Sequence, residues 1–349
     1  MGPIDKLPLD YTHDGAGIIR VIPPEMSPVS PPKTKYLRDR LVPPLLRVAL
    51  WCSYRLPLEW TRGLGRWLGR LLYRADGRSR RVTERNIALA YPELDPVGQQ
   101  DLVRSSLEET GALAAEMGHV WHAPWPHTAG LIASAEGSDQ VRQALDQGHG
   151  VIILAPHLGN WEVLGLHLAT LGDTVALFEP PKIPGLGPII QRARERSGSR
   201  LVPTDARGLA ALVRCVRKGG ISGILPDQVP DAAAGGHNVP FMGVTCGTAS
   251  LACNLIRRSN ASAFMGVAFR CEGGFRVHYV PAPEGVYHDD EVAALVAMND
   301  AVADLVRGHD TQYQWSYKRF RCRPEDGTDH YRDLKAPRSR FQIKPEQKR

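Results

Sequence analysis

The chain has 349 residues, enough for one large domain or two of ordinary size. Its hydrophobic content of 43% is ordinary for a globular protein and allows a sizeable core, and its six cysteines are scattered, which argues against a disulfide scaffold or a paired-cysteine metal site. Free thiols in a reducing compartment are therefore expected. The net charge of +6 and pI of about 9.0 favour an acidic partner: nucleic acid, anionic lipid or an acidic carrier protein.

The N-terminal residues do not form a secretory signal, because residues 1–34 contain aspartates and many prolines but no apolar stretch. We expect a flexible tail there. A basic amphipathic membrane-associated region is expected over 36–92. Its most apolar part, 41–58, is a poor transmembrane helix because it contains Arg47, Arg55 and three prolines.

A row of arginines follows. Arg62, Arg66, Arg70 and Arg74 recur every four residues and would share one face of a helix, whose remainder is rich in leucine and tryptophan. This pattern is typical of a helix that lies in a membrane interface. The alternative is a solvated basic face on a helix whose other side joins the core. Glycines at 63, 65 and 69 weaken the helical tendency.

Helices are then predicted at 80–91 and from Pro96 to about His122, and strands and helices alternate afterwards. This alternation predicts an α/β fold over 93–325, with a mainly parallel central sheet flanked by helices, before a basic tail at 326–349. An apolar loop is expected at 239–243 and a helix start at 247–250. The predicted strands are 150–156, 174–178, 200–202 and 221–225, with a hairpin of 261–270 and 275–280. The predicted helices are 138–147, 161–171, 187–197, 207–218 and 290–307.

A histidine and a carboxylate lie five positions apart where the apolar run 151–154 ends. His157 would occupy the loop between strand and helix, with Asn160 as the helix N-cap and Glu162 in the first turn. Ligands of open α/β sheets bind at this edge, and an imidazole backed by a carboxylate is a candidate general base. A simple surface hydrogen bond is the alternative interpretation.

Other polar residues also follow predicted strands. Lys182 and Asp227 lie just past strand ends, and Arg192 and Arg194 lie on a helix nearby. Together they would suit a substrate with phosphate or other anionic groups. Each has a plainer interpretation, as a solvated charge or a turn residue. The basic and aromatic residues at 313–323, taken alone, would also suit a nucleic-acid surface.

No competing catalytic signature is present. The chain lacks a G-x-S-x-G elbow, a Walker A loop and a Rossmann fingerprint, and the surroundings of Cys246 and of the histidines at 119, 122 and 127 match no known nucleophile or metal spacing. A base without a nucleophilic serine or cysteine points to direct transfer. The base would deprotonate a hydroxyl that attacks an activated acyl group, and arginines would stabilise the tetrahedral intermediate.

These residues resemble the late acyltransferases of lipid A biosynthesis, within the wider lysophospholipid acyltransferase superfamily. The family hallmark H-x-x-x-x-D/E is met by His157 and Glu162. Further family motifs occur in the same order between about residues 36 and 325. They are 85–93, Glu116 with Trp121, Pro181 with Lys182, 192–198, 226–228, 239–243 and 313–324.

The resemblance implies a glycerolipid acyltransferase-like fold and an enzyme on the cytoplasmic face of the cell inner membrane. It implies an acyl carrier protein thioester as donor and a hydroxyl of a lipid A precursor as acceptor, with neither a metal nor a dissociable cofactor nor nucleic acid. His157 would be the base and Glu162 its orienting partner. Arg194 first, or Arg192, would complete the site together with Asp227, with Lys182 and Asn160 as further substrate-binding candidates.

The chain departs from the family pattern in its charged, proline-containing N-terminal segment, which favours monotopic attachment over a single span. It also has Ser316 and Tyr317 where a histidine is common. Two alternatives stay open. The same chemistry would serve another acceptor, such as a phosphatidylinositol mannoside, an ornithine lipid or a lysophospholipid, with acyl-CoA as a possible donor. A non-catalytic, basic lipid-binding protein is the other.

Overall fold

A computed structural model describes residues 33–230, 235–322 and 328–335, with the side chains of 33–38 left aside. The tail expected at 1–34 lies outside the described residues except for its last two, which begin the first helix. Of the tail expected at 326–349, only 328–335 is described. All six cysteines lie in the described residues, and no disulfide joins them there.

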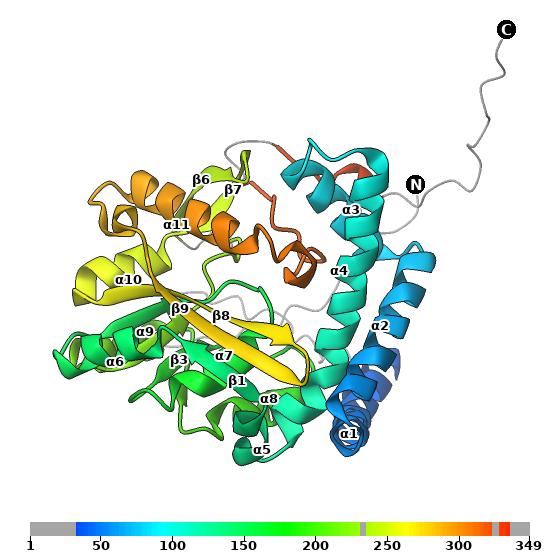
Figure 1. Ribbon diagram of the computed structural model, residues 1–349, viewed down its shortest axis with the longest axis horizontal. Coiled ribbons are helices and arrows are strands. Elements are labelled where there is room, and N and C mark those ends of the chain that lie inside the picture. Colours follow the sequence, from blue (N-terminus) through cyan, green and yellow to red (C-terminus); the bar gives the residue numbers. More distant parts are fainter. Residues whose placement is uncertain (1–32, 231–234, 323–327, 336–349) are drawn as a thin grey trace, which may run out of the picture.

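A five-stranded sheet forms the centre of the molecule, in the order β1-β9-β8-β2-β5 (Figure 1). Three of its four pairings are parallel, and β8 and β9 form the expected antiparallel hairpin. The predicted mainly parallel sheet is therefore confirmed, although β1 was not anticipated. The strands are β1 (Ile132–Glu136), β2 (Val151–Leu154), β5 (Ile221–Ile224), β8 (Ser262–Cys271) and β9 (Gly274–Pro281).

Both faces of this sheet are covered. Ile152 and Leu154 of β2 belong to one apolar cluster, and Val151 and Ile153 belong to the other. This alternation explains the continuous apolar run, since a parallel strand is buried on both sides. The helices that follow are α3 (Arg78–Ala90), α4 (Pro96–Met117), α5 (Trp125–Gly130), α6 (Ser138–Asp146), α7 (Trp161–Leu168), α8 (Leu186–Glu195), α9 (Ala206–Arg217), α10 (Leu251–Ser259) and α11 (Glu291–Val306).

Two smaller sheets accompany the central one. The parallel pair of β3 (Val175–Phe178) and β4 (Arg200–Pro203) lies next to β5, where Thr174 forms a parallel bridge with Ile221. The strand β6 (Gly236–Phe241) pairs with β7 (Val244–Ala249) in an antiparallel hairpin. The loop expected at 239–243 is thus wrong. The helix start expected at 247–250 is displaced, since residues 247–249 belong to β7 and α10 begins at Leu251 after its N-cap Ser250. Met242 and Gly243 both have positive φ, which gives the tight turn that such a hairpin needs.

The N-terminal region consists of α1 (Lys33–Arg55) and α2 (Leu58–Arg74). The expectation that prolines interrupt the helix within 41–58 is wrong for Pro43 and Pro44, because α1 continues through both. The helix ends at Arg55, before Pro57. Proline removes backbone hydrogen bonds but keeps a helical φ. Within the part of the chain that the structure describes, no helix combines the length and apolar character needed to cross a bilayer.

The arginine row of α2 runs along the side of the helix next to α4, from the buried Arg62 to the exposed Arg74. Arg66 and Arg70 pair with Glu109 and Glu108 of α4, at 2.9 and 3.6 Å, and Arg62 is almost fully buried. The expectation of an outward basic face is therefore wrong for Arg62, whereas Arg70 and Arg74 are exposed. The glycines explain how α4 comes so close, because a Cβ on Gly65 would lie 2.4 Å from the carbonyl oxygen of Gly111.

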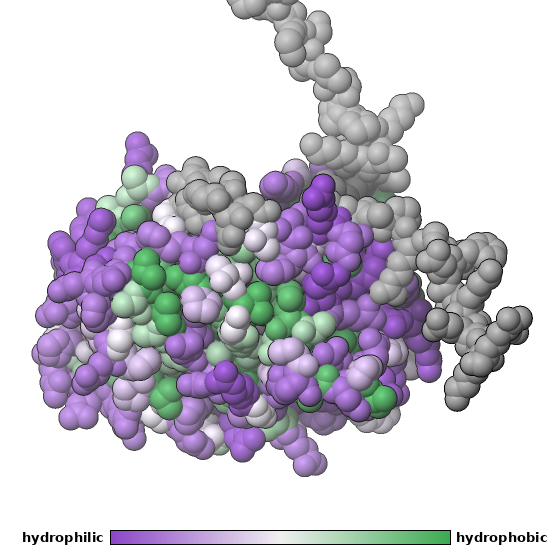
Figure 2. Space-filling view, turned by 90° about the horizontal axis from the view of Figure 1, so that it is seen from above, coloured by the Kyte–Doolittle hydropathy of each residue, from purple (hydrophilic) through white to green (hydrophobic). Residues whose placement is uncertain are grey.

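The outward side of these helices is apolar instead. In Figure 1, α1 and α2 lie on the outer side of α4, away from the sheet. Trp60 is 72% exposed, and Leu45, Val48 and Trp67 are at least half exposed. Apolar residues also gather near the middle of another face, within a polar surround (Figure 2). Exposed apolar patches of this kind mark contact surfaces.

Candidate active site

The loop after β2 has the predicted position and form. It connects Leu154, the last residue of β2, to α7, which begins at Trp161. The side chain of Asn160 accepts a hydrogen bond from the backbone N–H of Val163 at 3.1 Å, so Asn160 is the N-cap of α7 as expected. His157 therefore lies at the carboxyl edge of the central sheet.

The neighbouring strand β5 delivers Asp227 to the same edge. Leu154 is paired with Ile224 in the parallel register of β2 and β5, and Asp227 follows three residues later. The Nδ1 atom of His157 is 2.8 Å from one carboxylate oxygen of Asp227, and its backbone N–H donates to the other at 2.9 Å. The orienting contact expected from Glu162 is thus made by Asp227, because the strand register brings Asp227 there.

The charge state of Asp227 determines the state of the imidazole. Burial alone would raise the pKa of Asp227, but the charge of His157 and its two hydrogen bonds outweigh this effect, so the pKa is lowered. An ionised carboxylate can only accept, so Nδ1 must carry the proton and Nε2 is the basic nitrogen. The His157 side chain is 14% exposed, which leaves its ring within reach of a ligand.

Residues near the C-terminus of the fold surround Asp227. The hydroxyl of Tyr313 forms a hydrogen bond with Asp227, and burial together with that carboxylate raises the pKa of Tyr313 well above its usual value. Arg319 is buried close by and donates to the carbonyl oxygen of Gly247 at 2.8 Å. Trp315 and Phe320 are also buried. Tyr313, Trp315, Arg319 and Phe320 of the basic and aromatic segment therefore lie in the interior beneath the site, whereas Arg321 is exposed.

The sequence did not predict a role at the site for Tyr313 or Arg319. Tyr313 and Arg319 lie in the closing family motif, and their signal was a set of polar and charged residues inside an aromatic-rich segment. Such a pattern indicates buried polar contacts, since a charge enters a core only when it is paired or hydrogen-bonded. The pattern does not identify the partner, which comes from β5.

Glu162 and Arg194 form a second pair. Arg194 of α8 donates through Nε and Nη2 to the two oxygens of Glu162, at 2.9 and 2.6 Å. Burial alone would lower the pKa of Arg194, but the hydrogen bond and charge of Glu162 more than offset this, and the pKa is raised. The arrangement is a bidentate ion pair that holds Arg194 in one orientation.

The other expected substrate-binding residues do not join this group. Lys182 is exposed on the loop after β3, and Arg192 is exposed on α8. Residues two apart on a helix point to nearly opposite sides, so Arg192 cannot share the direction of Arg194. Asn160 is fully buried and occupied by its cap, and it faces α4. The expectation that Asn160 contacts substrate is therefore wrong.

An apolar cavity of about 110 Å³ lies beside the Glu162–Arg194 pair. Trp161 connects it with the histidine, since its ring meets that of His157 edge-on at 4.8 Å and also lines the cavity. Beyond Trp161 the lining is mostly apolar and comes from α7 and from β3, β4 and β5. It includes Leu164, Gly165, Leu168, Ala176, Leu177, Leu201 and Leu225.

The lowered pKa of Asp227 predicts a pH effect on stability. Its folded pKa lies below the unfolded value of about 4, so its contribution is present above that pH and is lost as pH falls through the folded pKa. The free energy of unfolding of Asp227→Asn should therefore fall less steeply than that of the wild type below about pH 4. Denaturant unfolding at a series of pH values measures this. Asp101→Asn, at an exposed ion pair, is the control and should follow the wild-type slope. Equal slopes for Asp227→Asn and wild type would contradict the assignment.

The chain is similar to known proteins over most of its length. A model of the bacterial lipid A biosynthesis acyltransferases matches residues 32–322. The chain is 23% identical to the lipid A biosynthesis palmitoleoyltransferase of Escherichia coli K12 over 279 residues, 79% of this chain and 89% of that protein. It is 22% identical to the lipid A biosynthesis lauroyltransferase of the same organism over 286 residues, with shares of 81% and 92%.

A lipid A biosynthesis acyltransferase of Haemophilus influenzae is 24% identical over 298 residues, which cover 81% of this chain and 91% of that protein. The family model spans far more than half of the chain and includes the loop with His157, the pair of Glu162 and Arg194, and Asp227. The chain belongs to the bacterial lipid A biosynthesis acyltransferase family and is an acyltransferase.

Proposed function

We propose that this protein transfers a fatty acyl chain from an acyl carrier protein thioester to a hydroxyl of a lipid A precursor, with His157 as general base. The observation that carries the proposal is the His157–Asp227 pair, which leaves Nε2 as a basic nitrogen, with the ring of Trp161 between His157 and an apolar cavity. The acceptor class is supported by relatives whose names state lipid A biosynthesis. The acyl carrier protein is supported by the basic charge of the chain.

The reaction needs no covalent intermediate on the protein. Nε2 of His157 takes the proton of the acceptor hydroxyl as its oxygen attacks the thioester carbonyl. The tetrahedral intermediate collapses with cleavage of the carbon–sulfur bond, and the departing thiolate receives the proton from His157. Asp227 stabilises the imidazolium between these two steps.

The Glu162–Arg194 pair has a different role in this proposal. Glu162 fixes the guanidinium through two of its nitrogens, which leaves Nη1 of Arg194 for the substrate. A cation held in place stabilises the negative oxygen of the tetrahedral intermediate without reorganising during the reaction. The exposed Lys182 and Arg192 supply further positive charge for the acidic carrier or for phosphate groups of the acceptor.

The apolar cavity receives part of the acyl chain. Gly165 of α7 lines it, and a Cβ at this position would meet no other atom within 4 Å. Space that a side chain would fill is therefore open to the chain. The volume of about 110 Å³ is small beside typical ligand pockets of roughly 300–1,000 Å³, so it suits a segment of the chain and not its whole length.

The outward apolar side of α1 and α2 holds the enzyme on the cytoplasmic face of the inner membrane, as a monotopic attachment. Exposed tryptophans beside leucines are typical of a helix embedded in the interface. Arg55 lies over the ring of Trp51 at 5.1 Å, so a cation accompanies the apolar side at its edge. The exposed apolar residues are Leu41, Leu45, Val48, Trp51, Leu56, Trp60, Leu64, Trp67, Leu68, Leu71 and Leu72.

The roles of the site residues predict graded losses of activity. In assays with acyl carrier protein thioester and lipid A precursor, His157→Ala should lower kcat by about 1,000-fold or more, and Asp227→Asn by about 100-fold. Glu162→Gln should cost less, about tenfold, because it weakens the hold on Arg194 and leaves the base intact. His149→Ala, at an exposed histidine, is the control and should keep wild-type activity. Full activity of folded His157→Ala would refute the mechanism.

The cavity predicts a change in chain-length preference. Gly165→Leu should fill the cavity and shift the kcat/KM ratio by about tenfold toward shorter acyl donors, since each methylene in an apolar pocket is worth about that factor. Competition between donors of two lengths, read by mass spectrometry of the product, measures the shift. Gly130→Leu is the matched control, because its Cβ would also meet no atom within 4 Å, far from the cavity lining. An unchanged ratio for Gly165→Leu would place the acyl chain elsewhere.

The apolar side of α1 and α2 predicts which conditions and which substitutions release the protein from lipid vesicles. Wild-type protein should stay on vesicles in high salt, because apolar burial is not screened. The double variant Trp60→Glu, Trp67→Glu should remain in solution in a flotation assay. Val97→Glu, an exposed apolar residue at the start of α4, should bind like the wild type. Undiminished binding of the double variant would show that this side does not contact lipid.

A further inference from the structure

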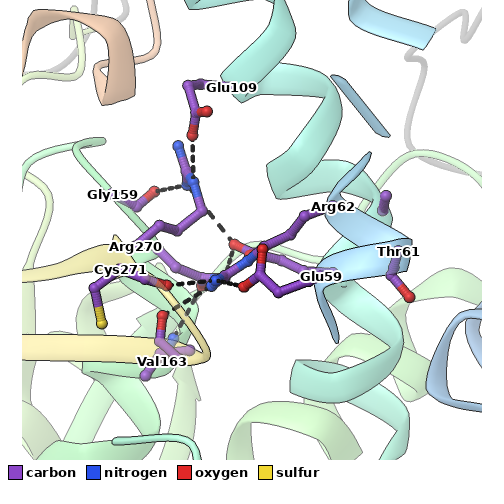
Figure 3. Close-up of polar contacts among 12 residues, drawn as sticks. Glu59, Thr61, Arg62, Glu109, Gly159, Val163, Arg270 and Cys271 are labelled. Atoms are coloured by element: carbon purple, nitrogen blue, oxygen red, sulfur yellow. Dashed lines mark hydrogen bonds and ion pairs between the residues drawn. The ribbon is translucent and has the colours of Figure 1, made fainter. Parts of the chain in front are cut away.

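A buried network of charges joins the N-terminal helices to the sheet. Arg62 of α2 donates through Nε to Glu116 of α4 at 2.7 Å, and Nη1 of Arg270 on β8 lies 3.7 Å from the other oxygen of Glu116. All three side chains are at most 3% exposed. Figure 3 shows Arg62 and Arg270 reaching toward each other from α2 and the sheet, with Glu109 above Arg270.

The network ends on the loop that carries His157. Arg270 donates through Nη1 to the carbonyl oxygen of Gly159 at 3.0 Å, a contact drawn in Figure 3. Asn160 donates through Nδ2 to Glu116 at 2.8 Å. Two adjacent loop residues are therefore tied to the same buried pair, one through the backbone and one through the side chain.

The loop backbone is otherwise tightly determined. Gly159 has a φ of +64°, and a Cβ there would lie 2.2 Å from the carbonyl oxygen of Ala268. The N–H of Asn160 donates to that same oxygen at 2.7 Å, and the carbonyl oxygen of His157 accepts from Gln314 at 2.9 Å. Movement of the backbone at 159–160 is thus transmitted to His157, whose own N–H must still reach Asp227.

Stability alone does not explain why these charges are buried, because removing charges from water costs free energy. Apolar residues of similar volume commonly stabilise a core as well as or better than a buried ion pair, so this network calls for another explanation. We propose that Glu116 and Arg270 are positioning residues, which hold the 157–160 loop so that the imidazole of His157 meets Asp227. The proposal rests on the function proposed for His157. It also links α2, through Arg62, to the geometry of the site.

Two substitutions separate this role from simple stability. Arg270→Lys keeps the charge but cannot bridge Glu109 and Gly159 together, as Arg270 does at 2.9 and 3.0 Å. Asn160→Ser keeps an N-cap oxygen for α7, but its shorter side chain has no amide group to donate to Glu116 while the oxygen caps the helix. Arg66→Lys is the matched control, because Arg66 binds the other oxygen of the same Glu109 at 2.9 Å and does not contact the loop.

The full-length protein in detergent is measured in three ways: thermal unfolding, steady-state kinetics, and NMR of protein labelled with ¹⁵N in its histidine rings, with the His157 signals assigned from His157→Gln. Arg270→Lys and Asn160→Ser should lower kcat by about tenfold to 100-fold with little change in KM, as expected for a misplaced reacting group. Both should shift the Nδ1–H signal of His157. Arg66→Lys should lower the melting temperature without either effect.

Folded Arg270→Lys and Asn160→Ser proteins with wild-type kcat and an unshifted His157 signal would overturn the proposal. So would an equal loss of kcat in Arg66→Lys, because the network would then act on overall stability. If Arg270→Lys does not fold, Asn160→Ser decides by the same readouts. Wild-type protein without transferase activity would refute the proposed function, whereas the His157 signal would still decide whether the loop is positioned by the network.

Discussion

The parallel register of β2 and β5 is the constraint on which the site depends. Leu154 is paired with Ile224, and each strand then sends its chain over the same edge of the sheet. His157 and Asp227 meet there because the two strands end side by side, although 70 positions separate them in sequence. Since a shift of register would separate the imidazole from the carboxylate, the buried strands that fix the register also fix the protonated nitrogen of His157.

Buried charged residues support the site from two sides. The polar residues that support the site are buried in two groups, one around Arg319 beneath Asp227 and one around Glu116 beside the loop. In both groups each charge has hydrogen-bonding partners, which is the condition for placing it inside a protein. Arg62 of α2 belongs to the second group, and the leucines and tryptophans of this helix lie outside. The same helix, α2, thus contributes Arg62 to the network that contacts the 157–160 loop and carries part of the exposed apolar surface.

The local parts of this structure could be predicted from the sequence. The run 151–154 identified a strand, and Asn160 before an apolar helix identified an N-cap, because both depend only on neighbouring residues. The partner of His157 could not be predicted by spacing. Glu162 is near in sequence, but Asp227 is brought to Nδ1 by tertiary pairing. Similarly, the four-residue period predicts that the arginines of α2 share one side of the helix, but it does not predict which element that side meets. Glu108, Glu109 and Glu116 of α4 pair with three of these arginines.

The proposed reaction adds one acyl group to a lipid A precursor. Mass spectrometry of lipid A from cells that lack this chain, compared with the parent strain and with cells complemented by the wild-type gene, tests it most directly. Lipid A from cells without the chain should be lighter by one acyl group, and complementation should restore the mass. An acyl pattern identical in all three strains would contradict it and would direct attention to another membrane acceptor.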